Sequence, residues 1–406
     1  MIMKNENDFI IENYHLKNKT QVLNTFLKRI PAEQSLKWWV GREKDLKLWN
    51  KILNDSRELN KSYIAFIIGS YGRGKTLSLY KIHEEAQKYP ELFPISLNFL
   101  GEEKSTGGLD FIFRIFRNIN FDKLVQGKDT KTIKNAIENI PDEFSDSRNI
   151  LIAIYEENLI KKWVIDGTSQ KDKSSPKRTP NSQKALLFLQ GDVKLSPTEL
   201  KTLGIQRKID KMDNAKKYLA GLLIFIKNIG YNSLVLTIDE FEYLFSLVPL
   251  NQRSTYIALL RGLYDLPSEL RIDSNKIANL VFFIAVSEDG WITLKNLGDK
   301  EVSYGGPTVP FMDRVDLYST LGTFNKKNTS ELISVRLKWN REEGTHVDEP
   351  LIPFTDDFVE YIFKNSRGEP REIITQCGRV LDMGIAQRIP KLTKKFAQEV
   401  LEQSFE

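Results

Sequence analysis

One octapeptide near residue 70 decides the fold of this 406-residue chain. It reads Gly69-Ser70-Tyr71-Gly72-Arg73-Gly74-Lys75-Thr76. An apolar run at residues 63–68 precedes it, and a helical pattern at residues 77–82 follows. This order of buried strand, glycine-rich loop and helix is the context that the phosphate-binding motif G-x-x-x-x-G-K-[ST] requires. The stretch therefore predicts a phosphate-binding loop (P-loop) within an α/β domain.

Each residue type in the P-loop has a physical use. Glycines adopt positive φ without strain and let main-chain N–H groups surround phosphate oxygens. The N-terminus of the following helix, which includes Leu77, adds a partial positive charge. Lys75 supplies a charge for the β- and γ-phosphates, and Thr76 supplies a hydroxyl for Mg²⁺. We expect residues 69–77 to bind ATP together with Mg²⁺.

Composition sets few further limits. The chain is 41% hydrophobic and 28% charged, with a formal net charge of +5, which permits an anionic partner without requiring one. The single cysteine, Cys377, excludes an internal disulfide and lies on the apolar stripe of a predicted helix. No signal peptide or membrane span is evident, so we expect a cytoplasmic protein. The histidines His15, His83 and His346 lack metal-ligand spacing and are assigned no chemistry.

Residues 93–99 read as a second strand, and a further apolar strand ends in two carboxylates. Residues 234–238 form a continuous run of β-branched residues and leucine, and Asp239 and Glu240 follow it. Carboxyl ends of buried parallel strands are where ligands bind in open α/β sheets. Beside a P-loop, Asp239 would hold Mg²⁺, and Glu240 would polarise the attacking water.

Another apolar strand, residues 280–286, ends at Ser287. A polar residue at this position can hydrogen-bond the γ-phosphate or the nucleophilic water. A serine that caps the next turn explains the same pattern equally well.

Three other segments have a candidate role by position. Val40 and Gly41 precede a helix about 25 residues before the P-loop, where they could lie beside a purine ring. A Gly-x-Pro turn at residues 368–370 holds Arg371 in the first turn of a helix, from which it can reach a nucleotide.

Residues 166–183 read as a mobile loop, either a solvated surface or a contact for DNA phosphates. The basic residues of this loop are Lys171, Lys173, Lys177 and Arg178.

Taken in order, these motifs resemble the AAA+ ATPases of the origin-recognition type over about residues 36–390. The resemblance rests on Val40-Gly41-Arg42-Glu43, the P-loop, Asp239-Glu240, Ser287 and Gly368-Glu369-Pro370-Arg371. The insertion, with Leu189-Gln190-Gly191-Asp192, Leu200 and Leu203-Gly204-Ile205, is similar to the ATP-binding proteins of BREX-type phage-defence systems.

The resemblance implies a role for each matching residue. Lys75 and Thr76 match the Walker A pair, and Asp239 and Glu240 match Walker B. Arg371 matches the sensor-2 arginine that contacts the γ-phosphate, while Ser287 falls at sensor 1, where these families often carry Asn. Arg314 falls where some relatives place the arginine finger that acts on a neighbouring subunit. The competing candidates for the finger are Arg261 and Arg271.

The predicted organisation is a helical arm at residues 1–35, a P-loop core at 36–320 and a helical lid at 321–406. A helical insertion occupies about residues 120–217 of the core. Only 35 residues follow Arg371, so we expect no winged-helix DNA reader there and sequence-independent contact with DNA at most.

The expected function is ATP hydrolysis that controls assembly on DNA or on a DNA-processing partner, within a phage-defence system or a mobile element. Such assembly would involve a homo-oligomer or a complex with defence proteins. The alternatives are a STAND-type signalling switch and a scaffold locked by ATP with little turnover; a small-molecule kinase fits less well.

Overall fold

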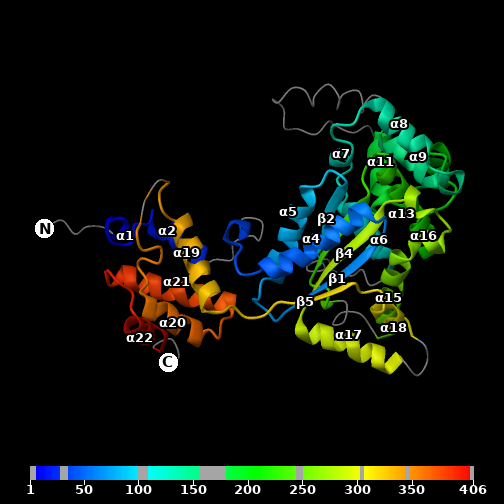
Figure 1. Ribbon diagram of the computed structural model, residues 1–406. Coiled ribbons are helices and arrows are strands. Elements are labelled where there is room, and N and C mark those ends of the chain that lie inside the picture. The colour runs from blue at the N-terminus through cyan, green and yellow to red at the C-terminus, as the bar shows by residue number, and fades with distance from the viewer. Residues whose placement is uncertain are drawn as a thin grey trace. The chain divides into compact units, whose positions relative to one another are not determined.

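The computed structural model describes residues 6–27, 35–98, 108–155, 180–243, 250–301, 306–343, 345 and 347–402. It shows a mixed α/β architecture with one five-stranded sheet in the order β2-β3-β4-β1-β5 (Figure 1). The strands are β1 (Tyr63–Ile68), β2 (Leu92–Asn98), β3 (Ser233–Asp239), β4 (Asn279–Val286) and β5 (Leu317–Thr320). The α/β P-loop fold predicted from the sequence is confirmed, although β5 was not predicted.

The register of the sheet brings the ends of three strands together. Strand β4 pairs in parallel with β1 on one side and with β3 on the other. Ile68 lies opposite Val286, and Ile238 lies opposite Ile284. Every residue of β1, β3 and β4 is buried, as expected for central parallel strands covered on both faces. The carboxyl ends of β1, β3 and β4 therefore meet at one edge of the sheet.

The chain divides into two compact units. One unit combines Leu48–Ile68 with Ile82–Ser319 and contains the sheet, apart from the last residue of β5. The other combines Met1–Lys47, Gly69–Lys81 and Thr320–Glu406. The P-loop thus belongs to the same unit as the C-terminal helices, while β1, which leads into it, belongs to the sheet unit.

The sheet unit carries most of the helices. Helix α13 packs on β3 and on α6, and α8, α9 and α11 form a helical layer with it (Figure 1). A continuous apolar core runs from Ile64 in the sheet to Phe225 in α13 and Phe311 in α18. The helices of this unit that lie after β2 are α6 (Gly108–Asn118), α7 (Phe121–Leu124), α8 (Thr130–Glu138), α9 (Ser145–Ile154), α11 (Pro180–Leu189), α12 (Pro197–Thr202), α13 (Met212–Asn228), α15 (Leu250–Tyr264), α16 (Leu266–Glu269), α17 (Glu288–Glu301) and α18 (Thr308–Met312). Single 3₁₀ turns lie at Asp142–Phe144 and Ser274–Lys276.

The second unit is helical. Four C-terminal helices form a lid, to which the N-terminal helices α1 and α2 add by packing on α21. Their shared apolar core includes Phe26, Phe358 and the buried Cys377, which confirms the core assignment of that cysteine. The helices are α1 (Glu6–Tyr14), α2 (Lys19–Leu27), α19 (Lys326–Trp339), α20 (Asp356–Asn365), α21 (Pro370–Ala386) and α22 (Lys394–Glu402), with a 3₁₀ turn at Leu36–Trp38.

Two further helices have residues in both units: α4 (Glu43–Glu58) and α5 (Lys75–Gln87). Helix α5 begins at the P-loop lysine, as the motif predicts. Among the described residues, no helix is long and apolar enough to cross a membrane.

Candidate nucleotide-binding site

The backbone of the P-loop has the conformation that its glycines permit. Gly72 and Gly74 have φ values of 88° and 93°, in the region that L-residues with side chains rarely occupy. Between them, the N–H of Arg73 donates to the carbonyl of Ser70 at 3.3 Å. The N–H of Ser78 donates to the carbonyl of Gly74 at 2.9 Å, so the helix follows the loop directly. The loop therefore ends in the N-terminus of a helix, where anions are stabilised.

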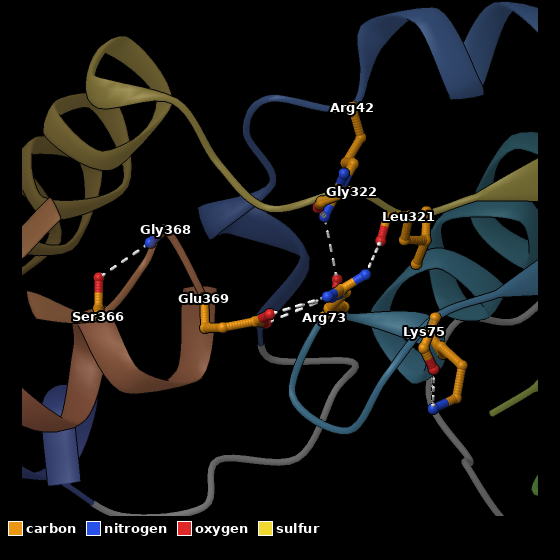
Figure 2. Close-up of polar contacts among 9 residues, drawn as sticks. Arg42, Arg73, Lys75, Leu321, Gly322, Ser366, Gly368 and Glu369 are labelled. Atoms are coloured by element: carbon orange, nitrogen blue, oxygen red, sulfur yellow. Dashed lines mark hydrogen bonds and ion pairs between the residues drawn. The ribbon is translucent and has the colours of Figure 1, made fainter. Parts of the chain in front are cut away.

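The loop has the features needed to hold a phosphate group. A Cβ atom built at Gly74 meets no atom within 4 Å in the described part of the chain, so none of the described residues fills this side of the loop. The ammonium group of Lys75 donates to the carbonyl of Gly69 at 2.9 Å and therefore lies against its own loop (Figure 2). Thr76 follows it in the first turn of α5. The residues present fit a nucleoside triphosphate with Mg²⁺, because the charge of Lys75, the hydroxyl of Thr76 and the backbone of Gly74 are adjacent in the chain.

The side chain of Arg73 leads from the P-loop to the lid. Its Nη2 and Nε atoms lie 3.0 and 3.2 Å from Oε1 of Glu369, and Nε lies 3.4 Å from Oε2. Its Nη1 atom donates to the carbonyl of Leu321 at 3.3 Å. Figure 2 shows the guanidinium group between these two partners. The Arg73 side chain is thus bound to the lid at two places, Leu321 and Glu369.

Arg42 supports the same network from the N-terminal segment. Its Nη2 atom donates to the carbonyls of Gly322, at 2.6 Å, and of Arg73, at 3.3 Å (Figure 2). Burial lowers the pKa of Arg42, and its guanidinium group lies 5.0 Å from the ring centre of Phe324. This role could not be predicted from the sequence, because both acceptors are backbone carbonyls that side-chain identity does not specify.

Arg371 lies beside the P-loop. Its guanidinium carbon is 4.4 Å from the ring centre of Tyr71, within the range of a cation–π interaction. A Cβ atom built on Gly72 would lie 2.9 Å from the Cβ of Arg371, so the lid helix approaches the loop backbone closely. The structure therefore brings together Arg371 and the P-loop, both of which the sequence predicted as nucleotide-binding.

A glycine turn sets the position of the lid helix. Gly368 has a φ of 71°, and a Cβ atom built there would lie 2.2 Å from the carbonyl oxygen of Phe324. The N–H of Phe324 donates to the Gly368 carbonyl at 2.7 Å. Ser366 accepts from the Gly368 N–H at 3.3 Å (Figure 2). Only glycine fits here, since both space and backbone angle exclude a side chain.

Val40 and Gly41 lie in the helical unit. Val40 is buried in the apolar core of that unit, and Gly41 has a φ of 70°. The N–H of Gly41 donates to the Glu43 carboxylate at 3.1 Å. The side chain of Asn328 would contact a Cβ atom at Gly41 at 2.7 Å. The contact with a purine ring stays a prediction.

The two predicted carboxylates lie at the end of β3 in the sheet unit. Asp239 is only 8% exposed, and its Oδ1 accepts the N–H of Glu240 at 2.9 Å. Glu240 has a φ of 56°, an unusual value for a residue with a side chain. Strained backbone of this kind clusters at functional sites. No group of three or more metal-ligating side chains occurs among the described residues, and Mg²⁺ bound to phosphates needs only one or two protein ligands.

Ser287 caps the helix that follows β4. Its Oγ accepts the N–H of Gly290 at 3.0 Å, and its own N–H donates to Oε1 of Glu242 at 3.1 Å. The capping role that the sequence allowed is therefore present, while the sensor role stays a prediction. Oε2 of Glu242 is buried and makes no hydrogen bond in the described part of the chain. Glu242 was not singled out from the sequence.

Arg314 is engaged within the sheet unit. It forms an ion pair with Asp265 at 2.7 Å and donates to the carbonyl of Pro310 at 2.6 Å. Arg261 lies 3.8 Å from the same carboxylate. The competing candidate Arg271 has a φ of 54° and lies just after α16. An arginine finger at Arg314 would have to leave Asp265, and this assignment stays a prediction.

Some predicted features lie outside the described residues. They are His346 and the basic residues Lys171, Lys173, Lys177 and Arg178. The described chain resumes at Pro180, where α11 begins.

The geometry so far defines a class of protein: a P-loop α/β protein whose helical lid places an arginine beside the loop. Residues 165–289 match the family model described as "BREX system ATP-binding protein BrxC/D". This match covers less than a third of the chain and confirms the resemblance expected from the insertion and the acidic strand.

Solved structures with a distant likeness include two ORC structures and one of Cdc6p. The Aeropyrum pernix ORC2 protein is 12% identical, with 94% of this chain and 71% of that chain covered and a TM-score of 0.48. Drosophila ORC bound to DNA is 13% identical, with coverages of 95% and 65% and a TM-score of 0.42. Cdc6p from Pyrobaculum aerophilum is 17% identical, with coverages of 92% and 69% and a TM-score of 0.43. No curated protein matches the chain.

Proposed function

We propose that this protein binds and hydrolyses ATP and uses its nucleotide state to control assembly on DNA or on a DNA-processing partner. The observation that carries the proposal is the position of Arg371 against Tyr71 of the P-loop, within one helical unit. A lid arginine at a phosphate loop gives the lid a direct means of sensing the nucleotide. The family match of residues 165–289 supports ATP binding and a role in phage defence.

Each residue of the site has a proposed role in ATP hydrolysis. Lys75 neutralises phosphate charge, while Thr76 and Asp239 hold Mg²⁺, which would supply further neutralisation of the phosphates. Glu240 orients the attacking water and accepts its proton. Arg371 stabilises the charge that develops on the transferred group. Arg314 acts on the nucleotide of a neighbouring subunit once it is released from Asp265.

Nucleotide binding is tested by titrating the protein with a fluorescent ATP analogue in the presence of Mg²⁺. Lys75→Ala removes a charge-assisted contact and is expected to weaken binding by about 10- to 100-fold. The control is Lys326→Ala, which alters an exposed ion pair with Glu360 on the lid. Equal affinity of the wild type and Lys75→Ala would contradict the proposed site.

Assembly is tested by measuring the mass of the protein in solution with and without ATP, Mg²⁺ and duplex DNA. Growth of the particle only with ATP, and further with DNA, supports nucleotide-controlled assembly. Arg314→Ala is then expected to keep ATP binding and to lose hydrolysis in the assembled state. A monomer under all conditions contradicts assembly of copies of this chain and the trans role of Arg314.

A further inference from the structure

The P-loop of this protein carries an arginine, Arg73, between the last two glycines of the motif. The consensus leaves this position open, because its backbone and not its side chain contributes to the phosphate cradle. Here the side chain extends to the lid and meets Glu369 through three contacts of 3.0 to 3.4 Å (Figure 2). The side chains are only 18% and 26% exposed. Such a charge-assisted, forked contact is directional as well as strong.

Glu369 is the residue before helix α21, a position where side chains usually bond to the first N–H groups of a helix. The Glu369 side chain makes no such capping bond. Its carboxylate is directed to Arg73 instead. The carboxylate therefore links two segments that are 296 residues apart in the sequence.

The link fixes Arg371, which follows Glu369 by two residues. Pro370 at the first helical position restricts the backbone between them, and the Gly368 turn is held against Phe324. Gly368 and Pro370 thus restrict the backbone on both sides of Glu369. The position of the Glu369 carboxylate therefore determines where the Arg371 side chain leaves the helix. That side chain reaches Tyr71 in the same loop as Arg73.

Arg73, the other member of the ion pair, is held by further hydrogen bonds. Arg73 donates to the Leu321 carbonyl, and Arg42 joins the Arg73 and Gly322 carbonyls. The guanidinium group of Arg73 therefore connects the P-loop with Leu321 and with Glu369 in the lid turn. An arginine that served only for solubility would not be bound in this way.

We propose that Arg73 is a positioning residue whose ion pair with Glu369 sets Arg371 on the P-loop and thereby gives the site its preference for ATP over ADP. This inference rests on the proposed ATP-binding function. It predicts that the pair affects recognition of the γ-phosphate, which Arg371 would contact, much more than recognition of the α- and β-phosphates that ATP and ADP share.

The test compares the affinities of fluorescent ATP and ADP analogues for variants of the full chain. Glu369→Gln and Arg73→Gln, which remove one charge each, are expected to weaken ATP binding about tenfold and ADP binding less than about twofold. The charge exchange Arg73→Glu with Glu369→Arg is expected to recover part of the preference. The matched control is Glu360→Gln, which breaks ion pairs with Lys326 and Lys364 on the same lid and should leave the ratio unchanged.

The outcomes separate this inference from the proposed function. If the wild type binds neither nucleotide, or if Lys75→Ala binds like the wild type, the proposed function fails. If binding depends on Lys75 but Glu369→Gln and Arg73→Gln keep the wild-type ratio of affinities, only the role of the ion pair is overturned. Thermal melts identify a variant that has lost its structure. If Arg73→Gln is such a variant, the ratio of affinities in Glu369→Gln, which keeps the size of the side chain, decides whether the ion pair has the proposed role.

Discussion

The guanidinium group of Arg371 lies 4.4 Å from the ring centre of Tyr71, so a lid residue contacts the phosphate loop through an aromatic ring. Tyr71 is 70% exposed, which is unusual for a large aromatic side chain that serves only packing. Exposed cation–π contacts contribute about 0.5–1 kcal/mol. The ring therefore biases Arg371 toward the loop without locking it there.

The first prediction concerns this ring. Tyr71→Ala is expected to weaken ATP binding about two- to fivefold, because Arg371 loses its support. Tyr71→Phe keeps the aromatic face and should bind ATP like the wild type. Titration of both variants with a fluorescent ATP analogue gives the comparison. Loss of affinity in Tyr71→Phe equal to that in Tyr71→Ala would show that the hydroxyl, and not the ring, matters.

The second prediction concerns the lid turn. Gly368→Ala places a Cβ atom 2.2 Å from the Phe324 carbonyl oxygen, at a φ of 71°. We expect a loss of more than about 2 kcal/mol in the free energy of unfolding of the lid and weaker ATP binding, because the turn carries Glu369 and Arg371. Chemical denaturation measures the first effect. Gly127→Ala is the matched control, since it too has a positive φ, of 77°, but no described atom near its Cβ.

If Gly127→Ala and Gly368→Ala lose the same stability, backbone strain alone explains the result. The contact with Phe324 would then have no separate effect.

The third prediction is a pH dependence at His83. Burial, with a smaller effect from the charge of Lys123, lowers the pKa of His83 from 6.5 to about 4. Between these values the unfolded chain binds more protons than the folded protein, so stability falls as the pH falls. The contribution is fully present above pH 6.5. At pH 5 it has decreased by at most about 2 kcal/mol, and solvent screening of this partly exposed ring reduces the loss further.

The measurement is denaturation by urea at pH 7.5 and pH 5 for the wild type and His83→Asn. The variant should lose less stability than the wild type over this interval. Nδ1 of His83 also lies 3.1 Å from Oγ of Ser96, and this Oγ lies 2.9 Å from Oγ1 of Thr237 on β3. The substitution removes the first of these contacts at every pH. The difference between the two pH values, rather than stability at one pH, is therefore the informative quantity. An identical pH dependence in both proteins would contradict the lowered pKa.

The fourth prediction concerns backbone strain at Glu240. Its φ of 56° costs a residue with a side chain about 1 kcal/mol relative to glycine. Glu240→Gly is therefore expected to raise the free energy of unfolding by about 0.5–1 kcal/mol while removing the proposed general base. Glu240→Gln should show the same loss of turnover without the gain. Equal stability of the two variants would mean that the strain is relieved elsewhere.

Much of the sheet and its motifs could be predicted from the sequence because local patterns determine them. The apolar run at residues 63–68, the glycine loop and the helix beginning at Lys75 agree with the structure residue by residue. The Gly-x-Pro turn likewise predicted the start of α21. Strand β5 was missed because it has four residues, of which only Ser319 is buried, so no hydrophobic period marks it.

The network around Arg73 could not be predicted in this way. Arg73 and Glu369 were both visible in the sequence, but nothing local relates two residues 296 positions apart. Arg42 binds carbonyl oxygens, which every residue has. Tertiary packing alone brings such groups together.

Hydrolysis of ATP at this site is measured by the steady-state rate of phosphate release from ATP with Mg²⁺, for the wild type and Glu240→Gln side by side. We predict measurable turnover by the wild type and a rate lower by about 10²- to 10⁴-fold in Glu240→Gln, with ATP affinity retained. If both proteins bind ATP and are equally inert, also in the presence of DNA, the protein is a nucleotide-bound scaffold and the account of hydrolysis is wrong.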